Sequence, residues 1–519
     1  MKKTYFLLVF LTFAGLASAE EIHSKSNTGG GLWSDPNTWT GNKVPTSADN
    51  AVISARDVVI FDGNDADKPS CASLSIDPSG SLVFQTNQTG TKHPIILNVA
   101  GPIESYGAIK IDASGDPTDQ MELHLTGPDA PGRTMAIKRG GSLAISGHKE
   151  LPDNRRNAII TYPAPPPSGE LAVITAGQNT MVDIQYAQLE YLRLDCNTID
   201  NTGSKPNERL NIIQNMFTRS ACIQLALCDT PAILRNTFTA SPKNPVAVAA
   251  MLIQRCALAD IRDNKLTGPA RFGMTVVGEC SAIGNTIEKF GTGITWNGGI
   301  GMMKRNTISD CETGIQLTSM NGSIEQTSIE KCKTGIYSTS SVAQLTNVHV
   351  GDAAVALQIE GTSSLSLLNC DIKKNQIKLS NGATAPADSA MIQSMQYVVV
   401  KLTGNVPKTG TVAVELKTTK PDKPLPEGAM DLNIRNSPSL VRTDMTPPPG
   451  PNSLVVNTWG IARDGKPTAV TDYTLNVIQP SEKPDEKPKI LKTLAIHPED
   501  SWYRSQATDG KPTLEVAVP

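Results

Sequence analysis

The chain has 519 residues and a formal net charge of -3, so it lacks the overall positive charge that nucleic-acid or anionic-membrane partners usually require. Hydrophobic residues make up 39% of the chain, which is enough to build packed cores and excludes a disordered protein. The 41 glycines, 36 prolines and 4% aromatic residues favour short strands joined by many turns, because glycine and proline are disfavoured inside helices.

The first 19 residues, MKKTYFLLVFLTFAGLASA, predict a secretory signal peptide. They combine a Lys-Lys start, an apolar run from Tyr5 to Leu16 and a small-residue cleavage site that ends at Ala19. No later stretch approaches the ~18 consecutive apolar residues of a membrane span. The sequence therefore predicts an exported protein without a membrane span, either secreted or held in the cell envelope.

The region after the signal peptide contains a recognisable series of motifs. Two of the chain's 5 tryptophans, Trp33 and Trp39, bracket a Ser-Asp-Pro-Asn turn. The full series is 33-WSDPNTW-39, Gly41, 44-VPTSADNAVI-53, 80-GSLVF-84 and 140-GGSLAISG-147. This series resembles the eight-glycine (G8) domain.

The G8 domain occurs in fibrocystin-like proteins and in cell-surface hyaluronidases, where a β-helix follows it. The resemblance therefore implies an extracellular protein with a link to polysaccharide, although kinship in fold does not carry an activity with it. The hyaluronidases have a His-x-His-type segment early in their β-helix. The corresponding segment of this chain, 182-VDIQYAQLEYLRLDCNTID-200, contains no histidine, which argues against hyaluronan cleavage.

An internal repeat dominates the middle of the chain. Its Asn-x-apolar starts, with Thr in one of them, lie at Asn215, Asn236, Asn264, Asn285, Asn306, Thr327, Asn347 and Asn369. A Gly-Ile pair follows eight residues later in three repeats, at Gly293, Gly314 and Gly335. This period is too short for a helix-turn-helix repeat, and the β-branched segments favour strands. The repeat predicts a right-handed parallel β-helix over residues 160–390. Its Asn residues are expected to adopt the left-handed backbone at a sharp bend and to stack their side-chain amides from rung to rung.

A β-helix must cover its exposed ends to avoid aggregation at the strand edges. We expect residues 20–150 to form an N-terminal β cap domain in which Trp33 and Trp39 pack against the first coil. After the repeat, alternating segments such as 397-YVVVKLTG-404 and 454-LVVNTWGI-461 predict an immunoglobulin-like β-sandwich over residues 391–519. The predicted fold class is thus all-β.

Candidate functional residues follow from the strand period. If Ile294, Ile315 and Ile336 point inward, the outward column is Thr295, Gln316 and Tyr337, which suits hydrogen bonding and ring stacking with a sugar chain. The preceding turn carries Lys289, Asp310 and Lys331. These three are candidate catalytic residues, but an alternating-charge ladder on a solvated turn is the favoured interpretation.

We expect no metal site and no cofactor. The 6 histidines are scattered, and the acidic run 62-DGNDAD-67 lacks the spacing of a calcium loop. Among the 9 cysteines, Cys311 with Cys332 and Cys228 with Cys256 should stack on neighbouring rungs. Disulfides and ladders of buried thiols are both compatible with that spacing.

Two classes of function are compatible with these features. The first is an exported or cell-surface protein that binds polysaccharide through its β-helix face, favoured because the outward strand column is uncharged. The second is a polysaccharide lyase or an inverting glycoside hydrolase, since enzymes on this fold act on glycans. In both cases the partner is a glycan and not a nucleic acid.

Overall fold

The computed structural model describes residues 19–519 apart from 26–28, 64–69, 86–93, 130, 152–154, 164–169, 198–209, 242–247, 373, 381, 388, 405–412, 419–434, 437–452, 469–471, 480–486, 488, 498–512 and 519. The predicted signal peptide lies outside the described residues, except for Ala19. Most of the acidic run at 62–67 is outside them as well. Within the described part, no helix is long and apolar enough to cross a membrane.

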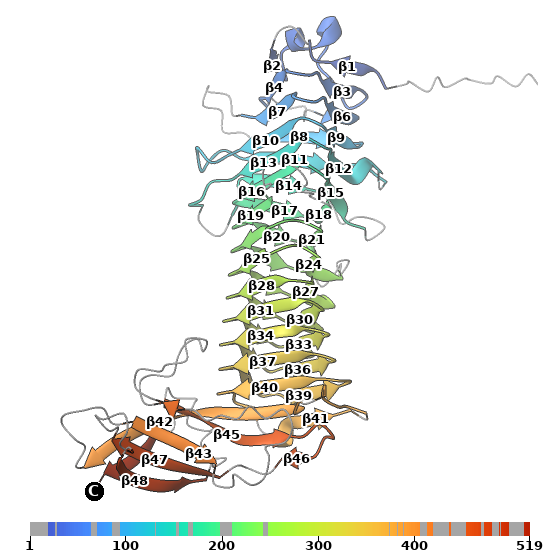
Figure 1. Cartoon of the computed structure of the whole chain (residues 1–519). Helices are drawn as coiled ribbons and strands as arrows, with labels where there is room; N and C mark the ends of the chain where they lie inside the picture. The colour runs from blue at the N-terminus through green and yellow to red at the C-terminus, as the bar shows by residue number, and fades with distance from the viewer. Residues whose placement is uncertain are drawn as a thin grey trace, which may run out of the picture. The chain divides into compact units, whose positions relative to one another are not determined.

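The described residues form two compact units, residues 1–163 and residues 164–519. Both units are built mainly from short parallel strands, which confirms the predicted all-β, parallel fold class (Figure 1).

The first unit contains three parallel sheets. The first consists of β1 (Glu21–His23), β3 (Asn50–Ile53), β6 (Ser73–Ile76), β9 (Ile103–Ser105) and β12 (Thr134–Ile137). The second consists of β2 (Gly30–Leu32), β4 (Val58–Phe61), β7 (Ser81–Phe84), β10 (Ala108–Asp112) and β13 (Ser142–Ser146). The third consists of β5 (Ser70–Cys71), β8 (Ile95–Val99), β11 (Met121–Leu125) and β14 (Ala158–Thr161). Short 3₁₀ turns lie at η1 (Pro36–Thr38), η2 (Thr40–Asn42) and η3 (Pro131–Arg133).

Parallel pairing therefore begins well before residue 160, the start that the repeat predicts. The G8-like region is itself made of parallel rungs, but its rungs lack the Asn-x-apolar signature of the later ones. An aromatic column stabilises its first rungs. The Trp33 ring lies 4.9 Å from Trp39 and 5.4 Å from Phe61, and Phe61 lies 5.1 Å from Phe84, between ring centroids.

The second unit continues with a coil whose rungs each supply one strand to each of three sheets. The first sheet contains β15 (Ala172–Ala176), β18 (Leu192–Asn197), β21 (Cys222–Ala226), β24 (Ala249–Gln254), β27 (Phe272–Val277), β30 (Thr292–Asn297), β33 (Thr313–Thr318), β36 (Thr334–Thr339), β39 (Val355–Glu360) and β41 (Ile377–Leu379). The second sheet contains β16 (Met181–Gln185), β19 (Leu210–Ile213), β22 (Ala232–Leu234), β25 (Ala259–Arg262), β28 (Cys280–Ile283), β31 (Ile300–Lys304), β34 (Asn321–Glu325), β37 (Val342–Thr346) and β40 (Ser364–Leu368). The third sheet contains β17 (Ala187–Glu190), β20 (Met216–Thr218), β23 (Thr237–Thr239), β26 (Lys265–Thr267), β29 (Thr286–Glu288), β32 (Thr307–Ser309), β35 (Ser328–Glu330) and β38 (His349–Gly351).

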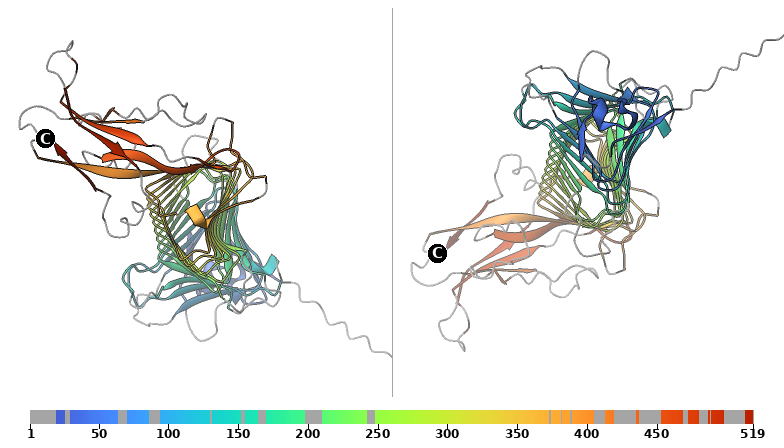
Figure 2. Two further views of the ribbon diagram at one scale, coloured as in Figure 1. Left: turned by 90° about the horizontal axis from the view of Figure 1, so that it is seen from below. Right: turned by 90° about the horizontal axis from the view of Figure 1, so that it is seen from above.

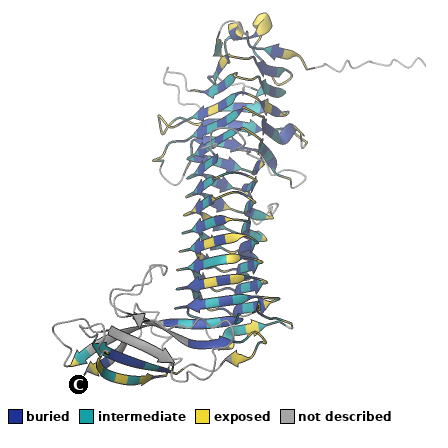
Figure 3. Cartoon of the chain, in the orientation of Figure 1, coloured by how far each residue is buried: buried dark blue, intermediate teal, exposed yellow. Residues whose placement is uncertain are grey.

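The interior of this coil follows from the strand period. Buried and solvent-facing residues alternate along its strands, so that Ile, Leu, Val and Phe side chains fill the space between the sheets (Figure 3). Viewed end-on, its green and yellow strands overlie one another around this interior (Figure 2).

The Gly of each Gly-Ile pair lies where the chain is crowded. A Cβ at Gly293 would come within 2.6 Å of the Ile308 Cγ2 and 2.7 Å of the Gly314 carbonyl oxygen.

The predicted Asn column exists as a hydrogen-bonded ladder. Asn215, Asn236, Asn264, Asn285 and Asn306 are all buried. The side-chain oxygen of each member after the first accepts hydrogen bonds from the backbone N–H and the amide Nδ2 of the preceding member, at 2.9–3.1 Å.

Two details of the Asn prediction are wrong. The left-handed residue is the one before the ladder position, for example Arg235 with φ 55° and Asp263 with φ 56°, because the side chain in the ladder points inward. Asn347 and Asn369 do not belong to this ladder, but both have the predicted left-handed backbone, with φ 54°, and the Asn369 Nδ2 donates to the Asn347 side-chain oxygen on the neighbouring rung. Since Ser328 pairs with His349, the partner of Thr327 is Val348, one residue later than the motif indicates.

The C-terminal strands extend from the last rung. The long strand β42 (Ile392–Gly404) pairs in parallel with β40 and then antiparallel with β45 (Ser453–Ile461). The remaining strands are β43 (Ala413–Thr418), β44 (Arg435–Asn436), β46 (Pro467–Thr468), β47 (Tyr473–Gln479), β48 (Lys489–Ile496) and β49 (Thr513–Val518), and a short turn η5 (Lys374–Gln376) precedes β41. Strands β44, β43, β47 and β48 form an antiparallel sheet. The immunoglobulin-like sandwich itself stays a prediction.

Candidate functional site

The outer face of the first sheet carries the predicted ligand column. Thr295 of β30 pairs in register with Gln316 of β33, which pairs with Tyr337 of β36. The inward neighbours of Thr295, Ile294 and Trp296, are fully buried. The strand period therefore places these three polar side chains side by side on one outer face.

Thr295 was expected to be exposed on the outer face. It lies instead in a pocket, and its side chain is only 5% exposed. The pocket has a volume of about 350 Å³. Its lining includes Arg271, Phe272, Thr295, Asn297, Glu312 and Gln316. Within the described residues, the Thr295 hydroxyl has no hydrogen-bond partner, and neither does the buried hydroxyl of Thr275 on the preceding rung.

Positive and negative charges do not balance at this pocket. The guanidinium of Arg271 lies 4.9 Å from the ring centroid of Phe272, and in the described part of the chain it forms no ion pair. Glu312 accepts a hydrogen bond from Lys333 at 2.8 Å, which lowers the pKa of the Glu312 carboxyl. Since Lys333 already balances Glu312, Arg271 gives the pocket an unbalanced positive charge.

Tyr337 lies beyond the pocket on the next rung. Its hydroxyl donates to the carboxylate of Glu360, and this hydrogen bond raises the pKa of Tyr337. The phenol is therefore held in place and stays protonated at neutral pH, so it can extend the polar face next to Gln316.

The turn residues Lys289, Asp310 and Lys331 lie elsewhere. All three are exposed and left-handed, with φ of 65°, 54° and 53°, and none lines the pocket. Asp352, with φ 50°, continues the same column. The structure thus places them as one alternating-charge series on a tight turn.

The structure also contains a cluster around His349 that the sequence does not predict. His349 lies between two carboxylates, with Nε2 3.0 Å from the Glu330 Oε1 and Nδ1 3.0 Å from the Asp371 Oδ2. Gly351 makes room for this, because a Cβ there would lie 2.2 Å from the Glu330 Oε2. A lone histidine in the repeats gives no signal of such a cluster, since the two acids come from different rungs.

No group of His, Cys, Asp and Glu residues in the described ranges is arranged to hold a metal ion. The two ring nitrogens of His349 face different carboxylates on opposite sides. They are therefore not directed at a common ion.

The nine cysteines are all buried thiols. Cys311 and Cys332 lie on neighbouring rungs, and so do Cys228 and Cys256, because the backbone N–H of Lys333 donates to the Cys311 carbonyl and that of Ala257 to the Cys228 carbonyl. Both predicted pairs therefore form, as thiol ladders. Burial raises the pKa of Cys71, Cys222 and Cys370 to about 12.

We expect the native protein to react very slowly with a thiol-specific reagent, because the thiolate is the reactive form and burial disfavours it. Unfolding in denaturant should release all nine thiols. The raised pKa values also predict that stability is full below pH 9 and falls as pH rises toward 12, because the unfolded thiols ionise first. Rapid labelling of several cysteines in the native protein at pH 8 would contradict the burial of these thiols.

Comparison with known families agrees with this architecture. Residues 38–156 match the family described as the G8 domain, and residues 199–377 match the family described as the right-handed β-helix region. The predicted resemblance to the G8 domain is therefore confirmed, whereas the narrower likeness to fibrocystin-like proteins and hyaluronidases stays a prediction. No curated protein matches the chain.

Proposed function

We propose that this chain, which carries a G8 domain and a right-handed β-helix region, is an exported protein that binds polysaccharide on the outer face of its first sheet. Both domains are typical of extracellular proteins. The observation that carries the proposal is the Thr295 hydroxyl, which is buried in the lining of a pocket and has no hydrogen-bond partner among the residues that the structure describes. Buried polar groups are nearly always satisfied, so a ligand is a natural partner for this one.

A sugar fits the chemistry of the pocket. Its hydroxyls both donate and accept hydrogen bonds, and the pocket offers the Thr295 hydroxyl together with the amides of Asn297 and Gln316. Arg271 would attract an acidic substituent on the glycan. Rungs repeat every ~4.8 Å, so a chain of sugars can lie along the coil and reach Tyr337.

Replacing Thr295 with valine should weaken glycan binding by about tenfold, the effect of roughly one hydrogen bond. Stability should stay unchanged or rise slightly, because the hydroxyl has no partner in the described part of the chain. Isothermal titration with the glycan selected from a polysaccharide panel, together with thermal unfolding, measures both quantities. A loss of glycan affinity without a loss of stability would show that the hydroxyl contacts the ligand and has no structural role.

Thr318→Val is a matched control, since Thr318 lies on the same outer face and does not line the pocket. Arg271→Ala should also weaken binding if the glycan is acidic, and added salt should then weaken binding by the unmodified protein. Equal affinities of the unmodified protein and the Thr295→Val variant would exclude this pocket.

A second candidate is a polysaccharide lyase or glycoside hydrolase, and the cluster of His349, Glu330 and Asp371 favours it. An imidazole with a carboxylate on each nitrogen is equipped to move protons. Lys289, Asp310 and Lys331 remain candidates under this alternative. New unsaturated or reducing ends after incubation with the polysaccharide panel would support it, and His349→Gln should then abolish them. Loss of activity in Asp310→Asn alone would assign catalysis to the turn.

A further inference from the structure

Within the described chain, the unpaired charge of Arg271 follows from its neighbours on the next rungs. The residues that immediately precede β27, β30, β33 and β36 form one column, which consists of Arg271, Gly291, Glu312 and Lys333. Glu312 and Lys333 are adjacent in this column and form an ion pair at 2.8 Å. Arg271 is adjacent to Gly291, which has no side chain, and two rungs of ~4.8 Å separate it from Glu312. The Arg271 guanidinium therefore stays available for a ligand.

The ring of Phe272 holds this guanidinium beside the pocket. The two groups lie 4.9 Å apart, measured from the guanidinium carbon to the ring centroid. A cation over an aromatic ring is attracted by the electrons of the ring face. The contact leaves the N–H donors of the guanidinium available, and their planar fork matches a carboxylate, which it can bind through two parallel hydrogen bonds.

The pocket is limited in size. Its volume of about 350 Å³ is near the lower end of the range of roughly 300–1,000 Å³ for ligand sites. Thr292 and Thr295 come from its central rung, Arg271 and Phe272 from the preceding one, and Gln316 from the following one. Two rung spacings of ~4.8 Å separate the outer strands, which leaves room for one sugar ring with its substituents. An acid group bonded directly to that ring can then reach Arg271 while the ring hydroxyls reach Thr295.

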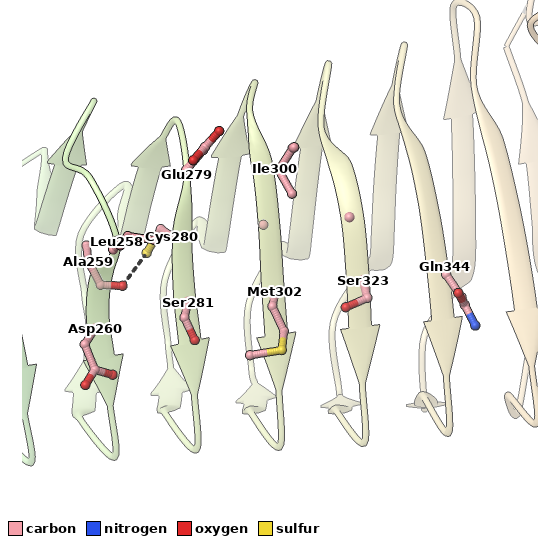
Figure 4. Close-up of a pocket in the computed structure, with 12 residues that line it drawn as sticks. Leu258, Ala259, Asp260, Glu279, Cys280, Ser281, Ile300, Met302, Ser323 and Gln344 are labelled. Atoms are coloured by element: carbon pink, nitrogen blue, oxygen red, sulfur yellow. Dashed lines mark hydrogen bonds between the residues drawn. The ribbon is translucent and has the colours of Figure 1, made fainter. Parts of the chain in front are cut away.

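The larger groove on the outer face of the second sheet offers no such cation (Figure 4). It has a volume of about 650 Å³. Its lining includes two acids, Asp260 and Glu279, and the apolar side chains of Ile300 and Met302. Among the described residues that line this groove, none is a lysine or an arginine. An acidic sugar is therefore expected at the Thr295 pocket and not at this groove.

We propose that Arg271 makes the Thr295 pocket selective for the uronic acid units of a polysaccharide. This inference rests on the proposed binding of polysaccharide at the same pocket. The sugar carboxylate pairs with the guanidinium of Arg271, and the hydroxyls of the same ring bond to Thr295 and Gln316. A neutral sugar leaves the guanidinium without a partner. A sulfate ester carries its charge farther from the ring, beyond an additional oxygen atom.

Isothermal titration with pairs of matched polymers tests the proposal. Polygalacturonate and alginate are each compared with their carboxyl-reduced form, in which a hydroxymethyl group replaces the carboxylate. The unmodified protein should bind the acidic form of at least one polymer about 10- to 100-fold more tightly, the effect of a hydrogen-bonded charge pair. Arg271→Gln should lose this preference by losing affinity for the acidic form alone, and Arg271→Lys should keep part of it.

Arg305→Gln is the matched control, because it removes the same charge from an exposed position that does not line the pocket. Arg305 has a φ of 54°, and Gln326 occupies the next position of the same turn column with a φ of 47°. Glutamine is therefore compatible with the backbone at this position. The control should retain the full preference for the acidic polymer, and circular dichroism should show that all variants are folded.

The outcomes separate this inference from the proposed function. Equal affinities for the acidic and the reduced polymers, with both weakened by Thr295→Val, would overturn the selectivity and leave the proposed function intact. A preference that persists in Arg271→Gln, or binding of dextran sulfate without binding of either polyuronate, would also overturn the selectivity. If no polymer binds, neutral ones included, the proposed function itself is wrong and the inference falls with it.

Discussion

Replacing Trp33 with alanine is expected to lower the free energy of unfolding by about 3–5 kcal/mol, the cost of removing a fully buried aromatic side chain. Trp33 is 2% exposed and Trp39 is fully buried. The Trp39 Nε1 donates to the Trp33 carbonyl at 2.8 Å. The Trp33 ring also packs edge-on against Phe61, so its loss opens a cavity at the head of an aromatic column.

Leu32→Ala is the matched control, because Leu32 is the preceding residue and is 41% exposed. Chemical denaturation of the two variants and the unmodified protein measures the difference. Glycan affinity should not change in Trp33→Ala as long as the protein stays folded, since neither tryptophan presents a ring face to solvent. A loss of affinity with unchanged stability would mean that the pair is a sugar platform after all.

The sequence predicts the coil wherever the repeat depends on side chains that the backbone requires. The Gly-Ile pairs and the inward Ile residues occupy positions where the coil has little room, so they recur visibly and set the strand register. In the first unit the same parallel pairing is built from generic apolar alternation, as in β8 and β11. Such alternation does not distinguish a rung from any other strand, which is why the repeat gives no sign of the parallel pairing before residue 160.

The position of the left-handed bend shows a second limit. Asn tolerates that backbone, so it is a reasonable candidate for the bend. The inward ladder needs the Asn amide, however, and the bend then falls on residues as different as Gln214, Arg235 and Gly284. A sequence motif shows which residue is constrained but not which of two physical constraints acts on it.

The candidate site was predictable only in part. Strand alternation is sufficient to place Thr295, Gln316 and Tyr337 in one column. The depth of Thr295 depends on the lengths of side chains from other rungs, so no local pattern predicts it. The cluster around His349 likewise depends on acids that lie 19 residues before it, at Glu330, and 22 residues after it, at Asp371.

Replacing Asn264 with leucine should destabilise the protein by about 3–9 kcal/mol, because three buried polar groups lose their partners at roughly 1–3 kcal/mol each. The Asn264 side-chain oxygen accepts from the Asn236 backbone N–H at 2.9 Å and from the Asn236 Nδ2 at 3.0 Å. Its Nδ2 donates to the Ile233 carbonyl at 2.8 Å.

Leucine has the same branched side-chain skeleton as asparagine and leaves no cavity, so the expected loss comes from the hydrogen bonds. The control is Asn211→Leu, because Asn211 lies half-buried on the outer side of β19 and should change stability by less than about 0.5 kcal/mol. Denaturant unfolding followed by circular dichroism measures both variants. Hydrogen exchange should also accelerate at the Asn236 amide and its neighbouring rungs, because the ladder connects one rung to the next. If Asn264→Leu and Asn211→Leu cost the same, the ladder would be a consequence of the fold and not one of the interactions that hold its rungs together.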